Sequence, residues 1–189
     1  EASGRWDADG VSVRAEGNKV NGTKLFVPDA NVADYILTAV NTGSGMAFAV
    51  VPSSATKITV LKTIAADKQA EVVYENAQAE DIIAVDAAAA EKIRNMATCL
   101  ECAYLVGLAQ KDFEISVNYA KERVQFGRPI GSFQAIQHKA ADMVTDVDGM
   151  RFIMYKAAWA TSEGEDSSTM DTAMAKAWCS DASRRVVAH

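Results

Sequence analysis

The first 86 residues show the alternation of apolar and polar positions that is typical of β-strands. Runs of this kind recur at "VSVRAE", "DYILTAV", "MAFAVVP", "ITVLKTI" and "AEVVYEN", and loops rich in Gly, Pro and Ser separate them. In "KVNGTKLFV", Asn21-Gly22 stands between two such runs, so we expect a hairpin turn there. Short strands joined by turns predict an antiparallel β-barrel or sandwich over residues 1–86.

From residue 87 to residue 189 the apolar positions follow the period of α-helices, and we expect no strand there. The first helix, over residues 86–124, should face the core with Ile93, Met96, Leu100, Ala103 and Gly107. The second keeps steps of three and four at Ile136, Ala140, Met143, Val147, Met150, Met154 and Ala157. A third helix follows "SEGEDSS". The predicted fold is α+β: an antiparallel β-domain (1–86), then an up-and-down helical bundle (87–189).

Both ends of the chain interrupt these patterns. It starts at Glu1 and stops within the helical pattern "ASRRVVAH", which has no cap. We therefore expect a piece of a longer protein with an incomplete bundle.

Charge and cysteine content narrow the partners and the compartment. The formal net charge is −6, which argues against a nucleic-acid or anionic-membrane partner, and no apolar run is long enough to span a bilayer. The three cysteines, Cys99, Cys102 and Cys179, are odd in number and irregularly spaced. We expect them to be buried packing residues in a cytoplasmic protein, or a mitochondrial-matrix protein in a eukaryote, with no metal site.

The segment between the first two helices, residues 123–133, carries more chemistry than a turn needs. We call it the interhelical corner. Gly127 could cap the first helix, Pro129 stops it, and Arg123 complements the helix dipole. A second arginine, an amide and an aromatic ring remain unexplained. Guanidinium groups bind phosphate oxygens and an aromatic face suits a purine ring. These residues leave open a nucleotide-like ligand or a solvated helix end.

The stretch "YAKERVQFGRPIGSFQAIQHKAADM" closely resembles the signature of the FAD-dependent acyl-CoA dehydrogenase family. The opening "EASGRWDADGVSVRAEGNKVNGTKLFVPDANVADYI" resembles the middle β-domain of that family. The resemblance implies that Arg123 contacts the pyrophosphate of an FAD held by a neighbouring subunit, with Gln125 and Phe126 against its adenosine half. Ile130, Phe133 and Ile136 would line the same cross-subunit pocket. Phe26 and Val27 would occupy positions that pack on the flavin.

The same resemblance implies α,β-dehydrogenation of an acyl-CoA thioester in fatty acid metabolism, with electron-transfer flavoprotein as the acceptor. It implies a homotetramer built as a dimer of dimers. The family's usual catalytic base would lie beyond His189, and the alternative position on the first helix is Ala97, so we expect no catalytic residue in this chain and no activity from it alone. Pro28 also lacks the hydroxyl expected near the flavin. Two alternatives stay open: a non-catalytic subunit of a hetero-oligomer, or a relative with oxidase-type chemistry.

Overall fold

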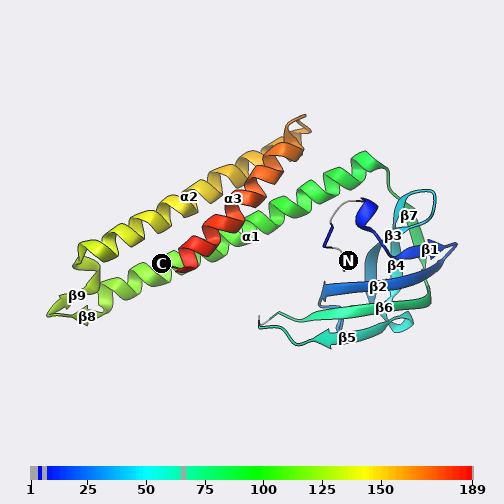
Figure 1. Ribbon diagram of the computed structural model, residues 1–189, viewed down its shortest axis with the longest axis horizontal. Coiled ribbons are helices and arrows are strands. Elements are labelled where there is room, and N and C mark those ends of the chain that lie inside the picture. The colour runs from blue at the N-terminus through cyan, green and yellow to red at the C-terminus, as the bar shows by residue number, and fades with distance from the viewer. Residues whose placement is uncertain (1–3, 6–7, 65–66, 189) are drawn as a thin grey trace. The chain divides into compact units, whose positions relative to one another are not determined.

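The computed structural model describes residues 4–5, 8–64 and 67–188. The chain divides into two compact units, Glu1–Ala90 and Glu91–His189 (Figure 1). Each unit has a buried core of its own. Within the described residues, no helix combines the length and the apolar character that crossing a bilayer requires.

The first unit contains a seven-stranded sheet in the order β5-β6-β2-β1-β3-β4-β7 (Figure 1). Its elements are η1 Ala8–Gly10, β1 Arg14–Glu16, β2 Lys19–Pro28, β3 Tyr35–Asn41, β4 Met46–Pro52, η2 Ser53–Ala55, β5 Lys57–Leu61, β6 Gln69–Gln78 and β7 Asp81–Ala84. The pairings are antiparallel except for a single parallel bridge between β1 and β3. The predicted, largely antiparallel sheet is confirmed.

The inner face of this sheet forms the core because apolar side chains alternate along its strands. Along β3, Ile36 and Val40 are buried, whereas Leu37 between them is exposed. Tyr74 of β6 joins Val51 of β4 in the same apolar cluster, so strands from both halves of the sheet enclose one core.

The predicted Asn21-Gly22 hairpin is wrong. β2 runs straight through these residues, and the turn lies earlier, because Glu16 pairs with Lys19. The pairing of β2 with β6 shifts register between Val20 and Gly22, which marks a bulge. A Cβ on Gly22 would lie 3.0 Å from the Cα of Val13, so glycine serves a close backbone approach here.

The second unit is helical and completes the α+β fold that the sequence predicts. Its main elements are α2 Gln134–Glu163, α3 Ser168–Ala188 and all but the first turn of α1 Ala87–Glu122. Between α1 and α2 lie β8 Val124–Gln125, β9 Arg128–Pro129 and η3 Ile130–Ser132. α2 ends at Gly164, which has a left-handed φ of 74° and whose N–H donates to the Ala160 carbonyl.

The helical core confirms the stripe predicted for α2. Met143, Val147, Met150, Met154 and Ala157 are buried, and Ile136 and Ala140 are half-buried. Cys99, Cys102 and Cys179 are free thiols buried in the same unit, as expected. The neighbouring thiol of Cys179 first, and burial second, raise the pKa of the Cys102 thiol above its ordinary value.

The predicted inner stripe of α1 is on the wrong face. Ile93 is 46% exposed, Met96 51% and Leu100 71%, whereas the buried apolar residues of α1 include Cys102 and Val106. α1 has apolar residues on two opposite faces, so periodicity alone could not select the one that packs against α2 and α3.

The carboxylate of Asp171, at the start of α3, is 2% exposed and forms an ion pair with Lys156 of α2 at 2.8 Å. Ser167 Oγ also donates to this carboxylate at 2.9 Å. The ammonium of Lys156 first, and the Ser167 hydroxyl second, lower the pKa of Asp171 below its ordinary value. This pair links two helices of the core.

A lowered pKa makes Asp171 stabilise the folded chain above the ordinary pKa of aspartate, and the stabilisation is lost as the pH falls through the folded-state pKa. We therefore expect Asp171→Asn to lower the free energy of unfolding at neutral pH, and the difference from the unmodified chain to shrink in acid. Urea unfolding over a pH series measures it. A difference that does not change with pH would contradict a charged role for Asp171.

Candidate functional site

The interhelical corner begins where α1 ends, at Glu122, and it folds into a hairpin of β8 and β9. The last pair before the turn is Gln125 with Arg128, which leaves Phe126-Gly127 as a two-residue turn. Their φ values of 55° and 78° are both left-handed, as such a turn requires. Two expectations are therefore wrong: strands do occur after residue 86, and Gly127 closes a hairpin rather than capping α1.

Phe126 occupies the left-handed conformation without being glycine or asparagine. This conformation costs a side-chain-bearing residue about 1–2 kcal/mol. Burial does not offset the cost, because Phe126 is 93% exposed. Its main ring contact is edge-to-face with Phe133, at a centroid distance of 6.1 Å and an interplanar angle of 87°. Because backbone strain clusters at functional sites, the exposed and strained Phe126 is a candidate binding residue.

Two arginines, Arg123 and Arg128, belong to the same corner, and neither has a carboxylate partner among the described residues. The guanidinium carbon of Arg128 lies 4.1 Å from the centroid of the Phe133 ring. Arg123 is exposed at the end of α1, and neither arginine takes part in an ion pair within the described part of the chain. Their charges remain available to an anion.

The hairpin brings the polar residues of the corner to one face. The N–H of Ile130 donates to the carbonyl of Arg123 at 2.8 Å, which extends the pairing of β8 with β9 by one step. Side chains alternate along a strand, so Arg123 and Gln125 project from the same face. Arg128 is opposite Gln125 and Ile130 is opposite Arg123, which places them on that face too.

Gly131 of the corner packs closely against the backbone of Ala120, near the end of α1. A Cβ on Gly131 would lie 3.0 Å from the carbonyl oxygen of Ala120. Ser132 Oγ donates to the Pro129 carbonyl at 2.7 Å, and Gln137 Nε2 donates to the Gly131 carbonyl at 3.2 Å. These contacts hold the corner against the ends of α1 and α2.

Replacement of Gly131 with alanine should destabilise the helical unit by about 1–3 kcal/mol, because the new methyl group meets a backbone atom that cannot rotate away. The matched control is Gly107→Ala in α1, where nothing lies within 4 Å of the new Cβ. It should be neutral or stabilising by up to about 1 kcal/mol. Thermal unfolding compares them, and equal effects would contradict the close contact.

The structure brings six of the eight expected site residues together at or beside the corner. These are Arg123, Gln125, Phe126, Ile130, Phe133 and Ile136, of which the last three are half-buried. Phe26 and Val27 belong to the other unit. Phe26 is 63% exposed with a left-handed φ of 57°, where the pairing of β2 with β6 shifts register, and Val27 packs against the sheet core.

The alternative base position carries no acid. Ala97 is exposed on α1, and the neighbouring Thr98 hydroxyl donates to the Arg94 carbonyl at 2.8 Å. Glu101, one turn further, is exposed.

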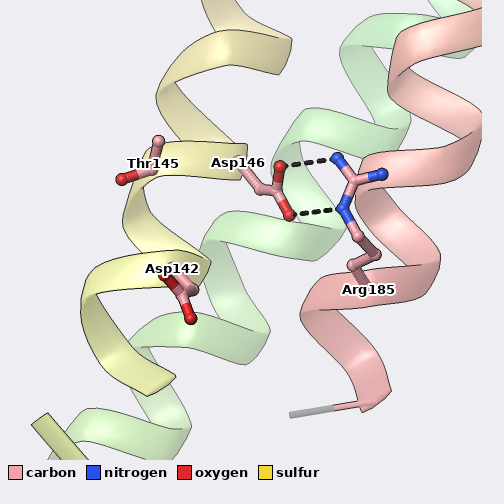
Figure 2. Close-up of a pocket in the computed structure, with 4 residues that line it drawn as sticks. All are labelled: Asp142, Thr145, Asp146 and Arg185. Carbon is pink, nitrogen blue, oxygen red and sulfur yellow. Dashed lines mark hydrogen bonds and ion pairs between the residues drawn. The ribbon is translucent and has the colours of Figure 1, made fainter. Parts of the chain in front are cut away.

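Sequence reasoning missed a polar site between α2 and α3, lined by Asp142, Thr145, Asp146 and Arg185 (Figure 2). Arg185 donates twice to Asp146, at 2.9 Å and 2.6 Å, and its guanidinium carbon lies 5.3 Å from the Trp178 ring centroid. The carboxylate of Asp146 raises the pKa of Arg185. Because 39 residues separate Asp146 from Arg185, no local sequence motif predicts this ion pair. Because these two charges satisfy each other, we assign them to joining α3 to α2.

Comparison with known proteins identifies the family of the chain. The family model described as "Acyl-CoA dehydrogenase, C-terminal domain" matches residues 87–189. The chain belongs to the acyl-CoA dehydrogenase family. It is 29% identical over 180 residues to acyl-CoA dehydrogenase FadE27 of Mycobacterium tuberculosis, a match that covers 90% of this chain and 48% of that protein.

Solved structures agree with this acyl-CoA dehydrogenase assignment. The ChsE4–ChsE5 complex from Mycobacterium tuberculosis contains a similar chain, with a TM-score of 0.82 and 30% identity over 97% of this chain and 52% of that one. Butyryl-CoA dehydrogenase from Megasphaera elsdenii shares the fold, with a TM-score of 0.81 and 24% identity over 100% of this chain and 54% of that one. This acyl-CoA dehydrogenase chain thus spans about half the length of such relatives.

Proposed function

We propose that the intact protein is an FAD-dependent acyl-CoA dehydrogenase that removes hydrogen from the α and β carbons of an acyl-CoA thioester. Membership of the family supports the reaction class. One observation supports the contribution of this chain: the corner that holds the exposed and strained Phe126 also holds Arg123 and Arg128, which have no ion-pair partner among the described residues.

The corner fits the nucleotide end of FAD. A pyrophosphate needs bidentate cationic donors, which Arg123 supplies, and an adenosine needs a flat apolar surface with a polar edge, which Phe126 and Gln125 supply. Half-buried apolar side chains at or beside the corner would line the pocket: Ile130, Phe133 and Ile136. On the β-unit, Phe26 would pack against the flavin ring together with Val27.

Bound FAD would supply the hydride acceptor. The role of this chain is then to bind and orient. The charge of Arg123 neutralises the pyrophosphate, and the apolar residues of the corner exclude water from its contacts. No residue of this chain is assigned as the base that takes the α-proton, which we place on a glutamate beyond His189. The corner would serve a cofactor held mainly by a second chain in a dimer of dimers, and electron-transfer flavoprotein would be the acceptor.

A non-catalytic subunit of a hetero-oligomer is the second candidate. Two features favour it: Ala97 stands at the alternative base position, and Pro28, at the end of β2, has no hydroxyl or N–H to donate. The solved ChsE4–ChsE5 structure is itself a complex. A glutamate at the family's base position beyond His189 would favour the enzyme, and its absence the partner subunit. Oxidase-type chemistry, the third possibility, would show as reoxidation by O₂ rather than by electron-transfer flavoprotein.

The absorption spectrum of the purified intact protein tests the proposal. We expect a visible flavin band that bleaches without oxygen when a suitable acyl-CoA from a panel of thioesters is added, and returns with electron-transfer flavoprotein. A protein that binds no FAD after reconstitution, or a flavin band that no thioester bleaches, would overturn the proposed enzyme. The 189-residue chain alone should not catalyse the reaction.

A further inference from the structure

Arg128 has no assigned task in the proposed site, although it lies on the same face of the hairpin as Arg123. We infer that Arg128 is a second anion-binding residue of the interhelical corner and contacts the FAD pyrophosphate together with Arg123. The inference rests on the proposed function and adds a residue to it.

Charge supports this pairing. Arg123 directly precedes β8 and is opposite Ile130, so Arg123 and Arg128 are diagonal neighbours across the hairpin, a relation that in antiparallel pairs corresponds to about 7–8 Å between Cα atoms. Both are exposed, and neither has an ion-pair partner within the described part of the chain. Two like charges on one hairpin face create a positive potential that an anion relieves. A pyrophosphate carries charge on each of its two phosphates, so it offers one phosphate to each guanidinium.

Geometry separates Arg128 from an ordinary surface cation. Its guanidinium lies 4.1 Å from the centre of the Phe133 ring, and Phe133 in turn contacts the edge of Phe126. A guanidinium held over a ring face loses part of its rotamer entropy in advance, and the ring does not use up its N–H donors as a carboxylate would. Arg128, Phe133 and Phe126 therefore form a prearranged set, with charge and aromatic surface side by side.

The test uses the apo form of the intact protein and three ligands: FAD, ADP and adenosine. ADP and adenosine share the base and the ribose, so the ratio of their affinities measures recognition of the pyrophosphate. We expect Arg128→Gln to weaken FAD by about tenfold or more, and to reduce the preference for ADP over adenosine by a similar factor. Adenosine binding should stay unchanged. Arg128→Lys should restore part of the loss because it keeps the charge.

Lys121→Gln is the matched control, since it removes one positive charge from the last turn of α1. It should change the FAD affinity by less than about twofold. If Arg128→Gln has no larger effect than Lys121→Gln, the inference fails. It also fails if Arg128→Gln weakens ADP and adenosine equally, because Arg128 then acts only through the packing of Phe133. If the unmodified apoprotein does not bind FAD, the proposed function fails instead, and if Arg123→Ala does not weaken FAD binding, the proposed role of Arg123 fails.

Discussion

Replacing Met150 with alanine should lower the free energy of unfolding of the helical unit by about 2–5 kcal/mol. Met150 is fully buried at the centre of α2, in a core to which α1 and α3 also contribute. The backbone carbonyl of Met150 also accepts a weak hydrogen bond from the thiol of Cys179 of α3 at 3.7 Å, so the neighbouring helix is packed directly against this position. The truncation loses the transfer free energy of the side chain and leaves a cavity that rigid neighbours cannot fill.

Urea unfolding of the 189-residue chain, followed by helical circular dichroism, measures this change. Met170→Ala is the matched control, because Met170 lies on α3 with 62% of its surface exposed. The control should stay within about 0.5 kcal/mol of the unmodified chain. A loss below about 1 kcal/mol for Met150→Ala would show that the three helices do not pack around this side chain.

Arg123→Ala should weaken FAD binding by the intact protein by about 1.5–3 kcal/mol, the value of a hydrogen bond to a charged group. The corresponding change in the dissociation constant is about 10-fold to 150-fold. Arg123 has no ion pair among the described residues, so its removal frees no buried carboxylate and should not disturb the fold. The loss should therefore appear in ligand binding and not in the stability of the apoprotein.

Titration of the apoprotein with FAD, followed by flavin fluorescence, gives the affinity, and thermal unfolding without FAD gives the stability. Lys121→Ala, two residues earlier, removes a nearby charge outside the hairpin and serves as the control. An unchanged affinity for FAD in Arg123→Ala would mean that Arg123 only complements the dipole of α1.

Hydrophobic periodicity predicts the buried face of α2 but not that of α1. α2 has a single apolar stripe, so the residues predicted to be buried, Met143 to Ala157, are the ones that pack. α1 has two apolar stripes, and the sequence does not say which one meets a partner. Ile93, Met96 and Leu100 look as suitable for a core as Cys102 and Val106, yet the structure buries the second set. Only the packing of three helices together decides between them.

Turns and local strain were harder to predict for a different reason. Asn-Gly is the strongest short hairpin signal, but at Asn21-Gly22 the ladder with β6 outweighs it. There the side chain of Asn21 accepts a hydrogen bond from the N–H of Asn76 at 2.8 Å, across the bulge. In the corner, strands of two residues are too short to leave a periodic signal. A left-handed Phe126 contradicts its own conformational preference, so no propensity could foresee it.

The sequence predicts the candidate site only through residue types that are unusual at a helix break. Two arginines and a phenylalanine at a helix break could be singled out, and the family resemblance assigned them to FAD. The position of Arg128 over the Phe133 ring depends on how η3 brings the chain back beside the hairpin. No sequence motif predicts that contact.

A long helix with apolar side chains on two opposite faces leaves one of these faces exposed to solvent when only the other is packed. The exposed apolar face of α1 extends from Ile93 to Tyr119, a length of about 39 Å at a rise of 1.5 Å per residue. The chain on its own should consequently sediment as aggregates or small oligomers whose size grows with concentration. Charged substitutions along this face should raise the solubility of the isolated chain. They should also disrupt any contact that this face makes in the intact protein.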